Sequence, residues 1–322
     1  MLGKVKRYLY RMIRVASVPS QLIVERQGIL LAIILAEANR ARQRLPGLHE
    51  VEFSVYSQWG EDGIIDWLID RLPGIPPTFI EFGVENYRES NTRLLLQLRN
   101  WRGLVLDGSQ EHIDDIKGQE IYWRYELSAV CAFVDKDNIN DLISNAGLSG
   151  DVGLLSVDID GNDYWVWQAI EIVNPVIVVC EYNAVLGDVH AVSVPYQATF
   201  QRTKADPSNL YFGASIRALI ALGMSKGYTF VGSTSTGANA FFIRNDCADS
   251  IVTGLNEIYA FPSRFREARD GNGRLLYLNG SARRELIDGL PFVDPVSGKS
   301  VDLSALGNIY SQNWINGLGV VL

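Results

Sequence analysis

Acidic and amide side chains follow two neighbouring β-like runs near the middle of the chain. They are Asp158, Asp160, Asp163, Glu181 and Asn183. Parallel strands end at the same edge of a sheet, so these side chains are expected to gather there. Oxygen ligands are what Mg²⁺ prefers. We assign Asp160, Glu181 and Asn183 as candidate metal ligands, and Asp158 and Asp160 as candidate catalytic groups.

Two kinds of chemistry follow from such a cluster. A bound Mg²⁺ would lower the pKa of a substrate hydroxyl and orient it. Without metal, one carboxylate would act as a general base. The structural alternative is that these residues cap the helix that follows and contact a cofactor.

The acidic run 158–163 fits two other patterns to different degrees. An EF-hand loop is excluded, because Asp163 stands where Gly is required and Ala169 where Glu is required. Asp158-Ile-Asp160 matches the DxD pattern of metal-dependent glycosyltransferases, although so short a pattern often occurs by chance. His190 follows Glu181 by nine residues and is a further candidate general base. A lone histidine in a loop is, however, more often incidental.

An earlier predicted strand ends in the sequence Phe79-Ile-Glu-Phe-Gly-Val-Glu-Asn86. Gly83 permits a sharp turn and close approach of a ligand to the backbone. The segment is not GxGxxG, and Glu81, Glu85 and Glu89 would repel a pyrophosphate. These carboxylates suit a cationic or zwitterionic ligand, such as a sulfonium amino acid.

The next predicted strand ends in Asp107-Gly-Ser109. An acidic residue about twenty residues beyond a glycine turn is placed to accept the hydroxyls of a ribose. The alternative is that Asp107 or Ser109 caps the following helix.

Strand-like and helix-like segments alternate over residues 55–245. The expected strands are Thr78–Val84, Gly103–Asp107, Leu127–Val134, Gly153–Ile159, Pro175–Glu181, Tyr228–Gly232 and Asn239–Ile243. The expected helices span 91–100, 110–117, 138–146, 163–173 and 213–226. Continuous apolar strands indicate burial on both faces. The pattern predicts an α/β, Rossmann-like, doubly wound and mostly parallel sheet with a terminal antiparallel hairpin.

The chain divides into three expected parts: a helical N-terminal arm over 1–50, a domain over 51–245 and an extension covering it over 246–322. Five Lys and Arg residues fall within the first fourteen positions, on a segment with helical apolar spacing. Residues 1–18 therefore suit peripheral contact with an anionic membrane. The alternative is an arm that packs on the domain or on a second subunit, which would make a homo-oligomer.

Composition excludes several classes of protein. The 322 residues have a net charge of −8, without the basic footprint of a nucleic-acid-binding domain. The longest apolar run, 28–36, is too short to span a bilayer and is a poor signal peptide. Three cysteines without a CxxC motif argue against zinc and disulfides and for a cytoplasmic protein. Cys131 and Cys180 are expected to be small core residues.

Several segments, in order, resemble landmarks of the FkbM-like methyltransferases. They are Tyr56–Asp62, Phe79–Gly83, Ser90–Thr92, Trp101–Asp107 and Ser156–Tyr164, with Gly213–Ser215 and Gly237–Phe242 resembling a subgroup found among glycan-related genes. The resemblance implies a class I fold that binds S-adenosyl-L-methionine. Under it, Glu81 and Gly83 line the methionine part, Asp107 holds the ribose, and Asp158 lies beside the methyl group. Gln58 and Asp62 close the pocket, and further cofactor contacts come from Asn86, Asn91, Gly108 and Ser109.

The resemblance has departures, because Glu85 and Asn86 replace the usual Gly-x-Gly spacing and Asp160-Gly-Asn-Asp163 replaces an acidic-Gly-acidic pattern. The sequence therefore predicts an O-methyltransferase acting on a hydroxyl of a saccharide or glycoconjugate, with Mg²⁺ as a candidate second cofactor. A glycosyltransferase using Asp158 and Asp160 and a non-catalytic binding module of the same fold are the alternatives.

Overall fold

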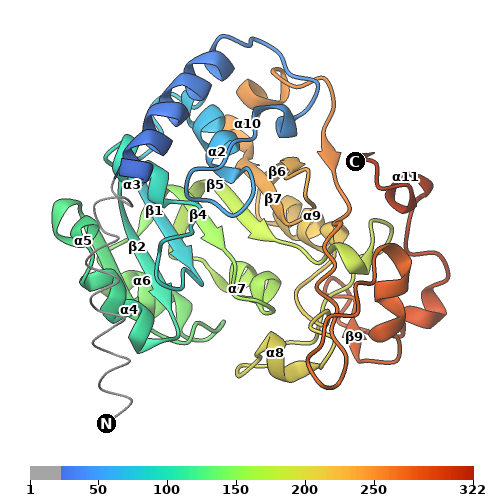
Figure 1. Ribbon diagram of the computed structural model, residues 1–322. Coiled ribbons are helices and arrows are strands. Elements are labelled where there is room, and N and C mark those ends of the chain that lie inside the picture. Colours follow the sequence, from blue (N-terminus) through green and yellow to red (C-terminus); the bar gives the residue numbers. More distant parts are fainter. Residues whose placement is uncertain (1–22) are drawn as a thin grey trace.

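The structure, a computed structural model, describes residues 23–322 (Figure 1). Residues 1–18, where membrane contact is predicted, lie outside the described residues. Residues 23–40 are helical and lie beside α2 and α3 at the upper left of Figure 1. No helix in the part of the chain that the structure describes is long and apolar enough to cross a membrane.

A seven-stranded sheet forms the centre of the molecule, with the strand order β3-β2-β1-β4-β5-β7-β6. Its strands are β1 (Thr78–Phe82), β2 (Arg102–Asp107), β3 (Leu127–Cys131), β4 (Gly150–Val157), β5 (Val173–Glu181), β6 (Tyr228–Ser233) and β7 (Asn239–Arg244). Neighbours from β3 to β5 pair in parallel, whereas β7 pairs antiparallel with both β5 and β6. The predicted Rossmann-like sheet with its terminal hairpin is confirmed.

Helices cover both faces of this sheet. The α-helices are α2 (Glu61–Asp70), α3 (Arg93–Leu98), α4 (Gln110–Lys117), α5 (Glu120–Arg124), α6 (Ile139–Asn145), α7 (Asp163–Ala169), α8 (Arg202–Ala205), α9 (Ile216–Ser225), α10 (Asn245–Val252) and α11 (Gln312–Ile315). Four short 3₁₀ helices accompany them: η1 (Leu48–Val51), η2 (Ala184–Leu186), η3 (Gly280–Leu286) and η4 (Leu303–Leu306). All five predicted helices exist, mostly shortened at their ends. Helices α2, α5, α8, α10 and α11 were not predicted from the sequence.

Alternation along each strand divides the core into two layers. In β1, Ile80 packs with α6, α7 and α9 on one face, whereas Phe79 packs with α2, α3 and α10 on the other. Both faces are therefore dry, which explains the continuous apolar strands. Cys180 belongs to the first layer as predicted. Cys131 is exposed, so its predicted core position is wrong; it ends β3, near the outer edge of the sheet.

Residues beyond α10 form a less regular part, most of which lies at the right of Figure 1. It contains two small sheets, in which β9 (Phe292–Val293) pairs with β10 (Ser300–Val301) and β8 (Tyr259–Ala260) pairs with β11 (Val320–Val321). A third apolar cluster joins this part to the loop after β5, through contacts such as Phe292 with Tyr211. The residues after 260 are therefore held close to the carboxyl ends of the strands.

Candidate functional site

Two connected clefts lie at the carboxyl ends of the parallel strands. The main cleft has a volume of about 560 Å³ and lies over the ends of β1, β4 and β5. The side cleft, of about 290 Å³, lies over the ends of β2 and β3. Gly83, Glu85, Asp158 and Asp160 line both clefts. This is the position where open α/β sheets bind ligands.

The junction between the clefts depends on Gly83, the residue after β1. Its φ of +73° is in the region that favours glycine, and a Cβ atom there would lie 1.8 Å from the carbonyl oxygen of Asp158. The turn after β1 can therefore lie directly against the end of β4. Only glycine permits that approach, which explains the sequence signal at this position.

Glu81 and Asn91 lie side by side in the wall of the main cleft. The buried Glu81 carboxylate accepts hydrogen bonds from the Ser90 hydroxyl and from the backbone N–H groups of Asn91 and Thr92. Burial raises its pKa. Asn91 donates to the Ser156 hydroxyl at 3.1 Å, across to β4. Glu81 therefore holds the 90–92 turn in place and has little capacity left for a ligand.

Asp107 ends β2 and lines the side cleft together with Gly108. One of its oxygens, Oδ1, accepts from the Ser109 N–H at 2.8 Å and lies 2.9 Å from His112 Nδ1. The other, Oδ2, accepts from the Glu85 N–H at 2.8 Å. Ser109 itself accepts from the His112 N–H and is the N-cap of α4, and its side chain lines neither cleft. Ser109 therefore caps α4, and the Asp107 carboxylate lies at the side cleft.

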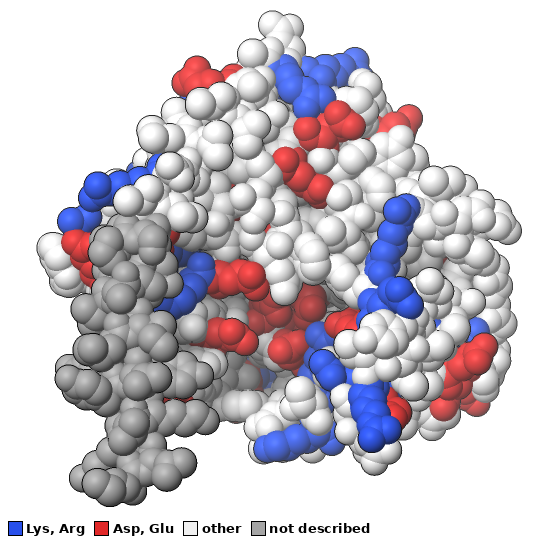
Figure 2. All heavy atoms as spheres, in the orientation of Figure 1, with Lys and Arg blue, Asp and Glu red and all other residues white. Residues whose placement is uncertain are grey.

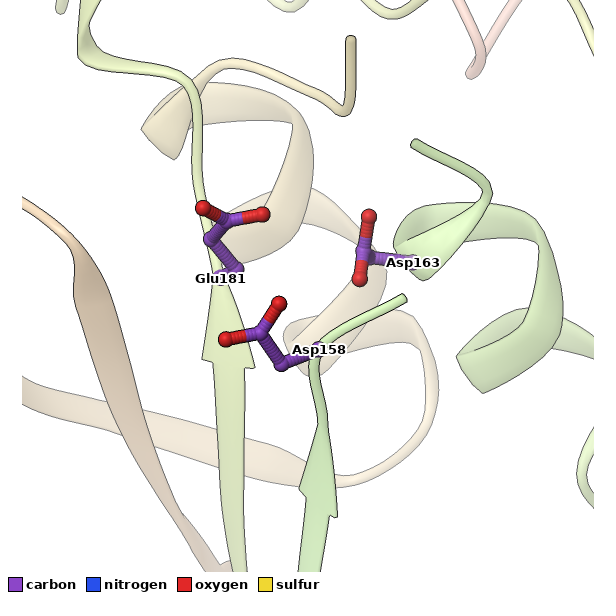
Figure 3. A group of neighbouring side chains, drawn as sticks. All are labelled: Asp158, Asp163 and Glu181. Atoms are coloured by element: carbon purple, nitrogen blue, oxygen red, sulfur yellow. The ribbon is translucent and has the colours of Figure 1, made fainter. Parts of the chain in front are cut away.

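Three carboxylates converge between the clefts and the sheet. Asp158 follows β4, Glu181 ends β5 and Asp163 begins α7, and their carboxylates point toward one another (Figure 3). One oxygen from each lies within 4.8 Å of the others. Asp163 also accepts from the N–H groups of Ile159 and Gly161, which fixes the loop. Oε2 of Glu181 is buried without a hydrogen-bond partner among the described residues.

This convergence perturbs the acidity of all three groups. Burial, together with the charges of Asp160 and Asp163, raises the pKa of Asp158 well above its usual range. Burial and the neighbouring Asp158 raise the pKa of Glu181 in the same way. Burial raises the pKa of Asp163 to about 6. Carboxyl groups with raised pKa values keep or accept a proton at higher pH than free carboxyls do.

Of the predicted metal set of Asp160, Glu181 and Asn183, only Glu181 belongs to this group of three carboxylates. Asp160 has a φ of +55°, and its side chain is 63% exposed and bonded to Arg202 at 3.0 Å. The Asn183 amide donates to the carbonyls of Leu210 and Phe212 and accepts from the Val185 N–H. Both residues line the main cleft, but their polar atoms are engaged elsewhere. Asp158 and Asp163 occupy the places beside Glu181 instead.

Three further predicted site residues lie outside both clefts. Asp62, buried in α2, accepts from the N–H groups of residues 55–57 and so fixes the loop before Gln58. Gln58 does line the main cleft. Asn86 accepts from the Arg88 N–H, within the turn after β1. His190 contributes its carbonyl oxygen to the Ser215 hydroxyl, and its position beyond η2 keeps its side chain out of the clefts.

Several lining residues were missed by the sequence analysis. The rings of Trp59 and Phe265 stack at a centroid distance of 4.7 Å at the main cleft. Arg202, on α8, stacks on Phe212 and bonds to both Asp160 and Glu267. Trp59 and Phe265 come from irregular segments and Arg202 from a four-residue helix, so no spacing in the sequence predicts a site there.

A buried arginine holds residues 263–265, the short strap that bears Phe265. Arg283, in η3, donates to the carbonyl oxygens of Ser263 and Phe265 and to the Ser263 hydroxyl. Loss of hydration lowers its pKa, and Tyr310 and Glu267 offset part of this effect. Its contacts with the strap therefore position Phe265 against Trp59.

The main cleft is strongly acidic. Figure 2 shows Asp and Glu side chains gathered in the central hollow of the molecule, with basic groups at its lower right rim. The acidic lining residues are Glu81, Glu85, Glu89, Asp158, Asp160, Glu181 and Glu267, and the basic ones are Arg202 and Arg266. An acidic cleft attracts a cationic ligand and repels a diphosphate.

Comparisons with known proteins give matches among solved structures alone. No family model matches the chain, and no curated protein sequence matches it. The chain is similar to the N-terminal domain of EvdMO1 with SAH bound, at 10% identity over 59% of this chain and 81% of that one, with a TM-score of 0.40. It is also similar to an S-adenosylmethionine-dependent methyltransferase from Clostridium acetobutylicum, at 9% identity over 57% and 90% of the two chains, with a TM-score of 0.36. The strand order and the pairing of the strands define the fold of this chain.

Proposed function

We propose that the protein is an S-adenosylmethionine-dependent O-methyltransferase that acts on a hydroxyl group of a saccharide or glycoconjugate. The observation that supports this proposal most is the junction at Gly83 and Asp158, where an acidic cleft meets the Asp107 side cleft. A ligand lying across the junction would place its ribose near Asp107 and a sulfonium among carboxylates. The FkbM-like sequence landmarks surround the same junction.

Bound S-adenosylmethionine would supply an electrophilic methyl group at its sulfonium. The acceptor hydroxyl would then need orientation and loss of its proton. Asp158 and Glu181 are placed for that proton: they face each other, and their raised pKa values make them stronger bases than ordinary carboxylates. The acceptor oxygen would bond to the methyl carbon as the carbon–sulfur bond breaks, leaving S-adenosylhomocysteine and a protonated carboxyl group.

The acceptor would enter the main cleft beside Trp59 and Phe265. Aromatic faces pack against the apolar faces of sugar rings, and Gln58, Asn239 and Ser263 offer hydrogen bonds nearby. These features support a saccharide as the acceptor. All three cysteines are free, in keeping with a cytoplasmic location, which is part of the proposal.

Mg²⁺ would fit the oxygens of Asp158, Asp163 and Glu181, since these lie together and one Glu181 oxygen has no hydrogen-bond partner within residues 23–322. Its chemistry there would be to lower the pKa of the acceptor hydroxyl. The glycosyltransferase alternative needs Asp158 and Asp160 to act as a pair. Asp160 instead bonds to Arg202, and the acidic cleft disfavours a nucleotide-sugar diphosphate.

Calorimetric titration with S-adenosylhomocysteine, with and without Mg²⁺, tests the proposal, with a nucleotide sugar as the control ligand. We expect micromolar binding of S-adenosylhomocysteine and none of the nucleotide sugar. Tighter binding in Mg²⁺ would support the carboxylate trio as a metal site. Binding of the nucleotide sugar alone would replace the methyltransferase proposal with the glycosyltransferase. Cofactor binding without transfer to any saccharide would favour a non-catalytic module.

A further inference from the structure

The helix over residues 23–40 packs on the domain through its small residues. Gly28, Ala32 and Ala36 are four residues apart and so share one face, and both alanines are buried. A Cβ atom on Gly28 would lie 3.1 Å from the Val55 side chain, so the helix approaches the domain closely. Ile29 adds a partly buried large side chain to this contact.

The opposite face of this helix consists of large aliphatic side chains that are open to solvent. At about 100° per residue, one side carries Ile23, Val24, Leu30, Leu31, Ile34 and Leu35. Their exposed fractions run from 45% for Leu35 to 64% for Val24 and Ile34. A helix on the surface of a soluble domain normally buries its large apolar residues and exposes polar ones. Here the arrangement is reversed, and an apolar patch of this kind marks an interaction surface.

The charge of the chain changes sign at the beginning of this helix. Residues 1–22 contain Lys4, Lys6, Arg7, Arg11 and Arg14 and no Asp or Glu. Residues 23–322 contain 24 Lys and Arg against 37 Asp and Glu. A basic segment next to an exposed apolar face, on an otherwise acidic protein, matches the chemistry of a bilayer surface that contains anionic lipid.

We propose that the outward face of helix 23–40 lies on an anionic lipid bilayer. The aliphatic side chains would enter the boundary between headgroups and acyl chains, and the Lys and Arg residues before the helix would bind lipid headgroups. Anionic lipid is the occupant that suits both features, since it offers acyl chains to the aliphatic face and negative headgroups to the basic segment. This inference is independent of the proposed methyl transfer.

Co-sedimentation of the full chain with vesicles tests it. One set of vesicles is phosphatidylcholine alone, and the other contains phosphatidylglycerol as well. The variant is Leu31→Glu with Ile34→Glu, at positions 60% and 64% exposed. The matched control is Met224→Glu with Val296→Glu, at positions 70% and 66% exposed on α9 and on a turn after β9. The melting temperature of each variant shows whether it folds. We expect both variants to fold, because none of the four side chains is buried.

We expect the wild type and the control to bind the phosphatidylglycerol vesicles, with binding that weakens as salt rises. The Leu31/Ile34 variant should bind at least tenfold more weakly, and phosphatidylcholine alone should bind poorly. Failure of the wild type to bind the anionic vesicles overturns the proposal, as does equal binding by the Leu31/Ile34 variant. If the wild type does not bind vesicles and light scattering shows a dimer that the variant abolishes, the face belongs to a second copy instead.

Discussion

Replacement of Asp107 by alanine tests the proposed ribose site, and the structure sets the size of the effect. The two carboxylate oxygens offer about four lone-pair positions. Ser109 and His112 occupy those on Oδ1, and Glu85 occupies one on Oδ2. One position on Oδ2 therefore remains for a ligand hydroxyl. A single hydrogen bond to a charged group contributes about 1.5–3 kcal/mol.

Asp107→Ala should therefore weaken binding of S-adenosylhomocysteine by roughly 10- to 150-fold. Calorimetric titration measures this, and the melting temperature of the variant shows whether the loop after β2 survives. His112→Ala is the matched control, since it removes one contact with Asp107 and leaves the carboxylate in place; we expect a change below about threefold. Unchanged affinity in a folded Asp107→Ala variant would remove Asp107 from the site and refute the argument from lone pairs.

Gly83→Ala should destabilise the fold and abolish binding of S-adenosylhomocysteine, because its Cβ atom would overlap the Asp158 carbonyl and its φ alone costs about 1–2 kcal/mol; an unchanged melting temperature would contradict this. Glu181→Gln should lower kcat by roughly 10²- to 10⁴-fold while cofactor affinity stays within about threefold. Since the base acts deprotonated, wild-type activity should fall with decreasing pH through the raised pKa of the Asp158–Glu181 pair. In the variant, Asp158 has one fewer negative charge beside it, which lowers its pKa. Residual activity should therefore persist to lower pH. Arg283→Met should raise the KM for the acceptor severalfold and leave cofactor affinity unchanged, because Arg283 holds the Phe265 strap. If acceptor binding and cofactor binding weaken equally, the variant is unfolded.

The apolar runs and their spacing were sufficient to predict the sheet. Each central strand is buried on both faces, so a run such as 176–180 has no polar interruption and can be recognised without tertiary information. Gly83 and Asp107 were also recognisable, since each follows the end of such a run. The missed helix α2 begins after Gly60 without a side-chain cap, and α5 has only five residues, so neither has a strong local signal.

The site was predicted in part. The sequence alone predicted that five polar residues lie at one edge of the sheet, because parallel strands end together. It did not determine which carboxylates face inward. Local backbone geometry decided that: the loop at Asp160 turns its side chain out to Arg202, while Asp163 turns back to bond with Ile159 and Gly161. Asn183 has the right chemistry for a ligand, but its amide bonds to the chain near residue 210.

Only the tertiary structure shows which side chains from distant segments contact one another. Trp59 and Phe265 are more than 200 residues apart in the sequence, and no periodicity relates them, yet their rings stack at the cleft. The outward face of helix 23–40 is a similar case. The sequence shows an apolar helical segment, but only packing reveals that its small residues face the domain and most of its large ones face outward. Local spacing fixes the elements and their strand-end residues, whereas the partners across space depend on how loops and extensions pack.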